Sequence, residues 1–404
     1  MSSPTGQLAS SLYIRAFQFS YWACIGVWFP FINAYYRTIG LSGTEIGLIG
    51  SLTALSGALG AALWGILHDR LGKSRLVFAG ICWGAILMAL LLSQLQQFTG
   101  ILLVASLLGF FTGPSSSQMD SMTLKLLGPH HSAYGSYRAW GTSGFVLSSA
   151  LAGAILQGLD LRAIFIFFPV VLFIFWLVTT RLPDRTIYQA PPLFDGLRQI
   201  AANPQWLLLM ASVFLLWTGV LSTFGLLGVA MKDMGSGDQE IGLVYTVAAL
   251  AEIPLFVGGQ YILRRFGATR LILVAMAAYT LRMLIYAVAV TPHTMIAVSL
   301  MQSITYCPFL IGVVALANQL APAELKSTSQ GLLGMTMSLS NVIGGLAGGW
   351  LYDHTGQVGL FIAGALTCLM ALALFGLGMR RLRGSISAPS AGGGPAAYQP
   401  DEAR

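Results

Sequence analysis

Charged side chains are scarce in this sequence of 404 residues, and two combinations of an acid and a base stand inside long apolar stretches. Asp120 and Arg138 form one acid and base combination, and Glu252 and Arg282 form a second. A guanidinium and a carboxylate bind the paired hydroxyls of a solute, and a guanidinium alone binds a carboxylate through two parallel hydrogen bonds. A carboxyl buried near an arginine is also suited to take up and release a proton. These residue types therefore predict solute binding and proton exchange.

The surrounding sequence has the composition of an integral membrane protein. Hydrophobic residues make up 56% of the chain and charged residues 9%, which is more apolar surface than one soluble core would bury. A membrane span needs roughly 20 apolar residues, and about twelve such stretches occur. Their approximate cores are 12–36, 44–66, 76–93, 100–126, 133–157, 162–181, 206–230, 240–263, 270–290, 294–320, 327–351 and 357–380. The predicted fold is an all-α membrane protein with twelve transmembrane helices.

Lysine and arginine gather in alternate loops. The basic loops hold Arg70, Lys73, Arg75, Arg181, Arg185, Arg198, Arg264, Arg265, Arg270, Arg380, Arg381 and Arg383. The positive-inside bias predicts that these loops and both termini are cytoplasmic, with the chain in the inner (cytoplasmic) membrane. The net charge of +7 then reflects topology, and we expect the lipid bilayer, and no nucleic acid, as a partner. The first apolar stretch is long enough to span and stay, so no separate signal peptide is expected.

An internal repeat divides the chain. Residues 44–75 align without gaps with residues 239–270, and the identities are mostly charges and glycines at the helix ends, including Glu45 with Glu240. Two six-helix halves related by an axis along the membrane normal are a known transporter pattern. The predicted organisation is an N-terminal six-helix bundle at 10–181, a cytoplasmic linker at 182–205, a C-terminal six-helix bundle at 206–383 and a disordered cytoplasmic tail at 384–404.

Helix geometry gives the depth of the first pair. Asp120 lies eight residues before Gly128, and Arg138 lies seven residues after His131. At about 1.5 Å per residue both should sit about 10–12 Å from the connecting loop, and therefore level with each other. Asp120 shares a helical face with Ser116, and Arg138 shares one with Phe145, which suggests a cavity wall. The alternative is that Arg138 extends to the headgroups and Asp120 only neutralises it.

The second pair should lie deeper. Glu252 precedes Arg264 by twelve residues, and Arg282 follows Arg270 by twelve, which places both about 18 Å from the cytoplasmic edge. That depth is near the middle of a hydrocarbon core about 30 Å thick, so we expect these residues to carry proton coupling. Structural pairing of the two helices is the alternative. Trp22 is a candidate to stack on a ring-shaped solute, although packing is the more common role of such a residue.

The segment "GILHDRLGKSR" at 65–75 resembles the signature loop between the second and third helices of the major facilitator superfamily. The residues that carry the resemblance are Gly65, Asp69, Arg70, Gly72 and Lys73. The resemblance implies a gating loop on the cytoplasmic side, whose contacts break when the two halves rock. The alternative role is that of a topology anchor, which would explain the basic residues but not Asp69.

Within that superfamily, the sequence resembles the proton-coupled group of the lactose and phenylpropionate permeases. The similar segments are "GVWFPF" at 26–31, "YGSYRAWGTSGF" at 134–145 and "AEIPLF" at 251–256. By this resemblance Asp120 and Arg138 match sugar-binding residues, and Phe145 falls where a tryptophan stacks on the sugar. The sequence departs from the lactose permease at Ser303 and Tyr306, which replace its histidine and proton-accepting glutamate.

These observations predict a secondary active transporter. The expected function is proton-coupled uptake of a sugar, aromatic acid or nucleoside by a monomer, with the proton as coupling ion and no other cofactor. An exporter or drug–proton antiporter of the same fold is the alternative, although its usual Gly-Pro motif is missing from stretch 133–157. An enzyme is not expected, because the histidines are scattered and the four cysteines lack metal-ligand spacing.

Overall fold

The computed structural model describes residues 4–128, 134–181, 200, 202–322 and 325–386. Within those residues the secondary structure is helical and contains no strand, which confirms the all-α prediction. Nine helical segments of the described chain are long and apolar enough to cross a membrane, and α4 is a shorter apolar helix. Residues 129–133 lie outside the described residues, as do most of the predicted linker at 182–205 and of the predicted tail at 384–404. Of these two segments, residues 204–205 begin helix α9 and residues 384–386 end helix α16.

The first half of the chain folds into α1 to α7. Their bounds are α1 Pro4–Thr38, α2 Gly43–Leu71, α3 Ser74–Leu92, α4 Phe98–Thr112, α5 Ser115–Leu127, α6 Tyr134–Leu156, the short 3-10 helix η2 Leu161–Ala163 and α7 Ile164–Thr179. The predicted stretch 100–126 is interrupted between α4 and α5, where Pro114 stands. Proline lacks the N–H that a continuing helix would use, and its ring crowds the preceding turn.

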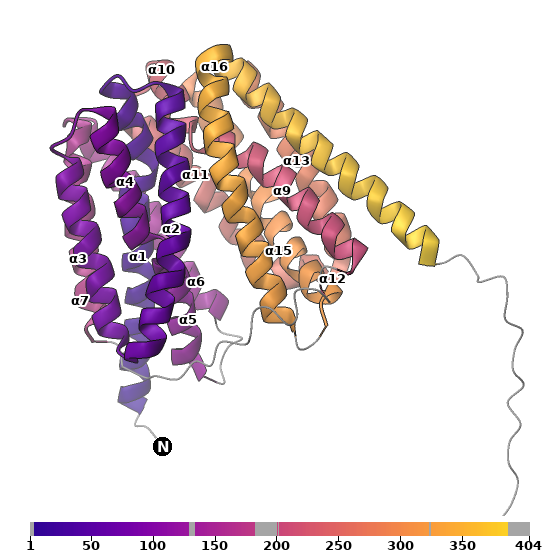
Figure 1. The fold of residues 1–404 in the computed structure, drawn as a ribbon, viewed down its shortest axis with the longest axis horizontal. Coiled ribbons are helices and arrows are strands. Elements are labelled where there is room, and N and C mark those ends of the chain that lie inside the picture. The colour runs from indigo at the N-terminus through magenta and orange to yellow at the C-terminus, as the bar shows by residue number, and fades with distance from the viewer. Residues whose placement is uncertain (1–3, 129–133, 182–199, 201, 323–324, 387–404) are drawn as a thin grey trace, which may run out of the picture.

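The second half folds into α9 to α16. Their bounds are α9 Pro204–Phe224, α10 Leu227–Asp233, α11 Asp238–Val257, α12 Gly259–Phe266, α13 Ala268–Val288, α14 Pro292–Ser299, α15 Gln302–Leu320 and α16 Lys326–Ile386. The last of these contains two predicted stretches, because Gly356 takes a φ of 65° and turns the chain back on itself. In Figure 1 α16 accordingly rises in orange and descends in yellow.

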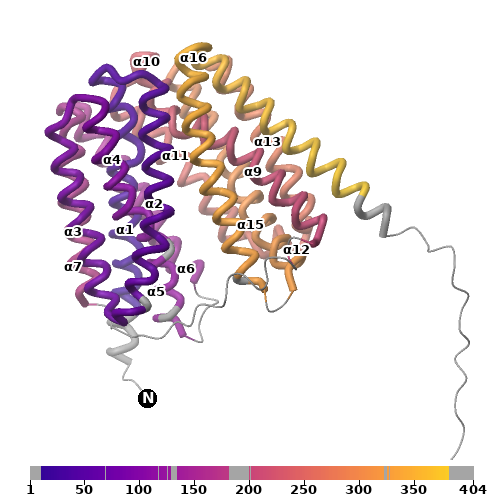
Figure 2. Tube along the Cα trace, viewed as in Figure 1, coloured from indigo at the N-terminus to yellow at the C-terminus, as the bar shows by residue number. Residues whose placement is uncertain are grey.

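The two halves stand side by side and approach each other most closely at one end (Figures 1 and 2). We name the end that carries α10 and the bend at Gly356 the outer end. The opposite end, which carries the α2–α3 turn at Gly72 and the α12–α13 turn at Gly267, is the inner end. Both of these glycines are matched in the repeat and have positive φ, 61° and 76°, which side chains rarely tolerate.

Two helix pairs join the halves through glycines. Helix α2 packs on α16 where Gly47 contacts Gly345 and Gly349, and α6 packs on α11 where Gly153 contacts Gly242. A Cβ on Gly242 would stand 2.7 Å from the carbonyl oxygen of Ser149, so a larger residue would force the helices apart. Gly47 and Gly242 occupy the same position in the repeat, so the repeat preserves the surface on which the halves meet.

The repeated glutamates have a structural role at helix starts. Glu45 accepts a hydrogen bond from the backbone N–H of Ser42 at 2.8 Å, and Glu240 accepts one from Gly237 at 3.1 Å. Each glutamate thereby satisfies a backbone donor just before a helix, and its charge lies at the positive end of the helix dipole. Helices α2 and α11 therefore begin in the same way.

Candidate functional site

A cavity of about 310 Å³ lies between the two halves. Trp22, Arg138 and Phe145 line it from the first half, and residues of α9, α11, α13 and α15 line it from the second. Among the described residues, the charged side chains in its wall are Arg138, Glu252 and Arg282. The cavity is thus where charges from separate helices come together inside an otherwise apolar protein.

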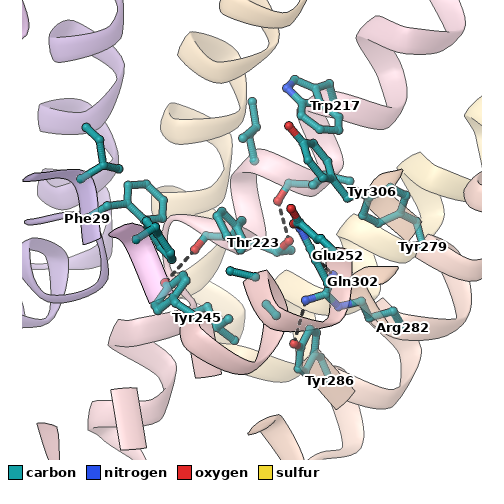
Figure 3. Close-up of a pocket in the computed structure, with 18 of the residues that line it drawn as sticks. Phe29, Trp217, Thr223, Tyr245, Glu252, Tyr279, Arg282, Tyr286, Gln302 and Tyr306 are labelled. Atoms are coloured by element: carbon teal, nitrogen blue, oxygen red, sulfur yellow. Dashed lines mark hydrogen bonds between the residues drawn. The ribbon is translucent and has the colours of Figure 1, made fainter. Parts of the chain in front are cut away.

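On the second half, Glu252 and Arg282 are linked through a third residue (Figure 3). The Nε2 of Gln302 donates to Oε1 of Glu252 at 3.0 Å, and the Oε1 of Gln302 accepts a hydrogen bond from Arg282. The described contacts include no direct ion pair between Glu252 and Arg282. The sequence placed the two charges at one depth, but it did not reveal the amide between them.

Arg282 is held on several sides. Its guanidinium also donates to the hydroxyl of Tyr286 at 3.1 Å and to that of Thr305 at 3.3 Å. Only 2% of its surface is exposed. A buried guanidinium is costly unless its donors are satisfied, and here neutral oxygens accept from both of its terminal NH₂ groups, whereas the Nε–H has no partner among the described residues. Its charge therefore has partners that do not depend on Glu252.

On the first half, Arg138 has a different environment. Its guanidinium carbon lies 3.9 Å from the centre of the Trp22 ring, which is a cation–π contact. Among the described residues no hydrogen bond to the Arg138 guanidinium occurs, so its N–H donors remain available to a ligand. Phe145 lines the same cavity.

Two of the predicted binding residues do not line the cavity. Asp120 and Ser116 lie on α5, outside the cavity wall. The Oδ1 of Asp120 is buried and has no hydrogen-bond partner among the described residues, and no ion pair with Arg138 is formed. The structure therefore does not bring Asp120 together with Arg138 in the cavity wall. Its role in binding stays a prediction.

Aromatic side chains form much of the remaining wall, and the sequence analysis had named few of them. Trp217 stacks on Phe309 and Tyr306, with ring centres 5.2 and 6.0 Å apart. Phe29 stacks on Phe224 at 5.4 Å, and Tyr245 meets Phe224 edge-on at 5.3 Å. Figure 3 shows Trp217 and Tyr306 of the first group and Phe29 and Tyr245 of the second at the cavity. Flat walls of this kind suit a ring-shaped solute.

The cluster of Phe29, Phe224 and Tyr245 stands beside a second cavity. This second cavity measures about 290 Å³ and shares Phe29 and Leu221 with the first. It is also lined by Gly47 and Gly345, which belong to the contact between the halves near the outer end. Phe29 thus contributes to the walls of both cavities.

Polar contacts close the outer end across the two halves. Arg37 pairs with Asp233 at 2.9 Å, and the hydroxyl of Tyr352 donates to the same carboxylate at 2.8 Å. Asp353 accepts hydrogen bonds from the backbone N–H groups of Gly43 and Thr44, both at 2.6 Å. The hydrogen bond to Asp233 raises the pKa of Arg37, so the guanidinium keeps its charge over the physiological range. Sequence reasoning had treated these loop charges as topological.

The predicted gating loop lies at the inner end. Gly65 and Arg70 belong to the last turns of α2, Gly72 caps that helix in a left-handed conformation, and Lys73 precedes α3. The side chain of Asp69 lies outside the described part of the chain. The loop is compact at its turn, where His68 and Ser74 hydrogen-bond at 2.8 Å. Its gating role stays a prediction.

Fold and cavity together define a class of protein. Many apolar helices, two halves joined at the outer end and a charged cavity between them are the features of a multi-pass membrane transport protein. The chain belongs to the MFS_1 like family, whose profile matches residues 12–363. It is therefore a major facilitator transporter and not an enzyme.

Relatives and solved structures agree with this assignment. The chain is 26% identical over 383 residues to the maltose permease of Geobacillus stearothermophilus, covering 90% of this chain and 95% of that protein. It is 23% identical over 401 residues to the sucrose permease of Escherichia coli, covering 91% and 94%. The multidrug resistance protein MdtG of Enterobacter lignolyticus is 29% identical, over 37% of each chain.

Two solved structures share the fold. The nucleoside transporter NupG superposes with a TM-score of 0.78 at 16% identity, covering 93% of this chain and 99% of that one. A bacterial homologue of the human lysosomal transporter Spinster superposes with a TM-score of 0.71 at 15% identity, covering 96% and 100%. These likenesses confirm the predicted major facilitator fold.

Proposed function

We propose that the protein is a secondary active transporter that takes up a small polar or aromatic organic solute together with protons. The observation that carries this proposal is the cavity that Arg138 faces from one half and that Glu252 and Arg282 face from the other. Charged side chains within a membrane are costly, and they are retained where a solute or an ion needs them. Sugars, aromatic acids and nucleosides are the candidate solutes.

The residues divide into binding and coupling roles. Arg138 offers free donors to hydroxyl or carboxylate oxygens, and Trp22 and Phe145 offer aromatic surface beside it. Glu252 supplies a carboxyl that exchanges a proton with the cavity. The names of the maltose, sucrose and nucleoside transporters support a hydroxyl-bearing solute.

Alternating access follows from the way the halves meet. The outer contacts of Arg37 with Asp233 and of Asp353 with α2 support a state that is closed at the outer end. The Spinster homologue of similar fold was solved inward-facing and unoccupied, which is consistent with that state. In the proposed cycle these contacts break when the halves rock and the inner end closes.

We further propose the arrangement in the cell that the sequence predicts. Both termini are cytoplasmic, the membrane is the inner membrane, and the transporting unit is a monomer of bundles 10–181 and 206–383. The linker 182–205 and the tail 384–404 lie on the cytoplasmic side. The proton is the coupling ion.

Transport into proteoliposomes tests the proposal. The purified protein is reconstituted, and accumulation of labelled disaccharides, nucleosides and aromatic acids is measured with and without an imposed proton gradient. We expect one class to accumulate when the outside is acidic, and to leak away when a protonophore is added. Accumulation that no proton gradient alters would refute proton coupling.

Export of drugs is the second candidate, and the partial similarity to MdtG favours it. An exporter would exchange a labelled drug for protons. When the lumen of the vesicles is acidic, protons would leave and the drug would accumulate inside. The same vesicles therefore separate the two functions by the direction of the gradient that supports accumulation.

A further inference from the structure

Gln302 occupies the first position of α15 and extends its side chain between two charged residues. Its amide N–H group donates to Glu252 of α11, and its amide oxygen accepts from Arg282 of α13. Figure 3 shows this chain of three residues at the cavity wall. One neutral amide therefore connects the carboxyl and the guanidinium that face the solute cavity.

The chemistry of Arg282 fixes the orientation of this amide. A guanidinium carries N–H donors and no acceptor, so only the oxygen of Gln302 is able to face it. The NH₂ group must then point the other way, toward Oε1 of Glu252. That oxygen is an acceptor whether the carboxyl is ionised or carries its proton on Oε2. The arrangement is therefore compatible with both protonation states of Glu252.

We propose that Gln302 is the positioning residue of the proton site, holding Oε1 of Glu252 and keeping the carboxyl apart from Arg282 so that Oε2 exchanges the proton. This inference rests on the proposed role of Glu252 as proton carrier. A carboxylate in direct contact with Arg282 would have to break a buried ion pair each time it took up a proton. With Gln302 between them, Arg282 keeps its hydrogen bonds to neutral oxygens in both states.

Other ionisable groups surround Glu252 and define its setting. They are Arg138 from α6, Arg282 and Tyr279 from α13, and Tyr306 and Cys307 from α15. Arg138 and Arg282 are the charged members of this group. A change at Gln302 leaves all of these groups in place.

The first test replaces Gln302 with Glu. The new carboxylate pairs with Arg282 and faces Glu252 with a second acid, so one of the two carboxyls retains a proton to higher pH. Equilibrium exchange of labelled solute is measured in proteoliposomes across a pH series. We expect the pH of half-maximal exchange to rise by at least about one unit.

The matched control is Gln239→Glu, the same chemical change at an exposed residue of α11 near the outer end. It should leave the pH profile unchanged. A Gln302→Glu carrier with altered activity but an unmoved pH profile would overturn the proposal, because a merely structural amide affects the amount of active protein and not the titration.

A second variant gives a readout that does not need transport. In Gln302→Met the carboxyl of Glu252 loses the donor to its carbonyl oxygen. On acidification an infrared band of the protonated carboxyl appears, and its absence in Glu252→Gln assigns it to Glu252. In Gln302→Met this band should move to higher wavenumber. A band at the same position in Gln302→Met would overturn the proposal.

The outcomes separate this inference from the function on which it rests. If Glu252→Gln still concentrates solute in response to a proton gradient, the proposed proton carrier is wrong, and Gln302 loses its role with it. If accumulation depends on Glu252 but variants at Gln302 change neither the pH profile nor the infrared band, proton coupling stands. Only the positioning role of Gln302 is then refuted.

Discussion

The start of α2 is capped by a residue from the other half of the protein. Asp353 of α16 accepts hydrogen bonds from the backbone N–H groups of Gly43 and Thr44 at 2.6 Å, and from the hydroxyl of Thr44 at 2.5 Å. Helix caps normally come from the residue just before the helix. Because this cap crosses between the halves, opening of the outer end in the proposed cycle would break it. Asp353→Ala should therefore weaken the closed state selectively.

The size of the effect follows from the bonds that are lost. Removing a capping side chain costs typically about 1 kcal/mol, within a range of about 0.5–2 kcal/mol. The contact to Thr44 is exposed, so water partly replaces the carboxylate, and we take about 1–2 kcal/mol for the three bonds together. A change of that size shifts an equilibrium by about 5–30-fold. The population open at the outer end should rise by that factor.

Distance measurements between spin labels report the two states. One label is placed at Gln157 in the first half and one at His293 in the second, both exposed near the outer end. The four native cysteines are buried and should not compete for the label. We expect Asp353→Ala to add a longer distance that is rare in the parent protein.

The control removes another aspartate cap at the same end. Asp160 accepts a hydrogen bond from the backbone of Arg162 at 2.8 Å, within its own half. Asp160→Ala should cost similar local stability and leave the distance distribution unchanged. Equal distributions in the parent and in Asp353→Ala, or an equal shift in Asp160→Ala, would refute a role for Asp353 in closing the outer end.

Three further predictions concern the cavity and the inner loop. Arg138→Lys keeps the charge but loses the planar fork, so solute affinity should fall at least tenfold, about 1.4 kcal/mol, in a binding titration on normally inserted protein; unchanged affinity would contradict direct binding. Glu252→Gln should retain exchange of labelled for unlabelled solute and lose accumulation driven by a proton gradient. The control changes both Glu252 and Arg282 to Gln, because the single change leaves the charge of Arg282 buried. Asp69→Asn should leave solute binding intact but slow net uptake, and a normal uptake rate would reduce the loop to a topology anchor.

The sequence predicted the helices well because apolar length and loop charge depend on local composition. It also placed Glu252 and Arg282 at one depth, since distance along a helix follows from counting residues. Counting does not give the direction in which a side chain points relative to neighbouring helices. Asp120 shows this limit, because it was predicted to line the cavity with Arg138 and lies outside the cavity wall. Gln302 shows it too, because a polar residue within a span has many possible partners.

Contacts between distant segments were beyond the sequence for a related reason. Arg37 meets Asp233, and Asp353 meets Gly43, only because the two halves close at the outer end. In the sequence these residues were ordinary loop charges opposite the basic loops. Their pairing depends on how two rigid bundles are arranged, and local patterns carry no information on that arrangement.

The internal repeat separates architecture from the proposed function. Gly47 and Gly242 match in the repeat, and both lie where the halves meet. The position matching Glu252 in the same gapless alignment is Gly57. Gly57 packs against Gly109 and Gly113 where α2 crosses α4. A Cβ at Gly57 would stand 3.2 Å from the carbonyl oxygen of Gly109, so a side chain as large as glutamate would press on the backbone of α4. The second half places the acid at the cavity instead. Residues shared by the halves therefore build the fold, and the proposed proton carrier stands where the two halves differ.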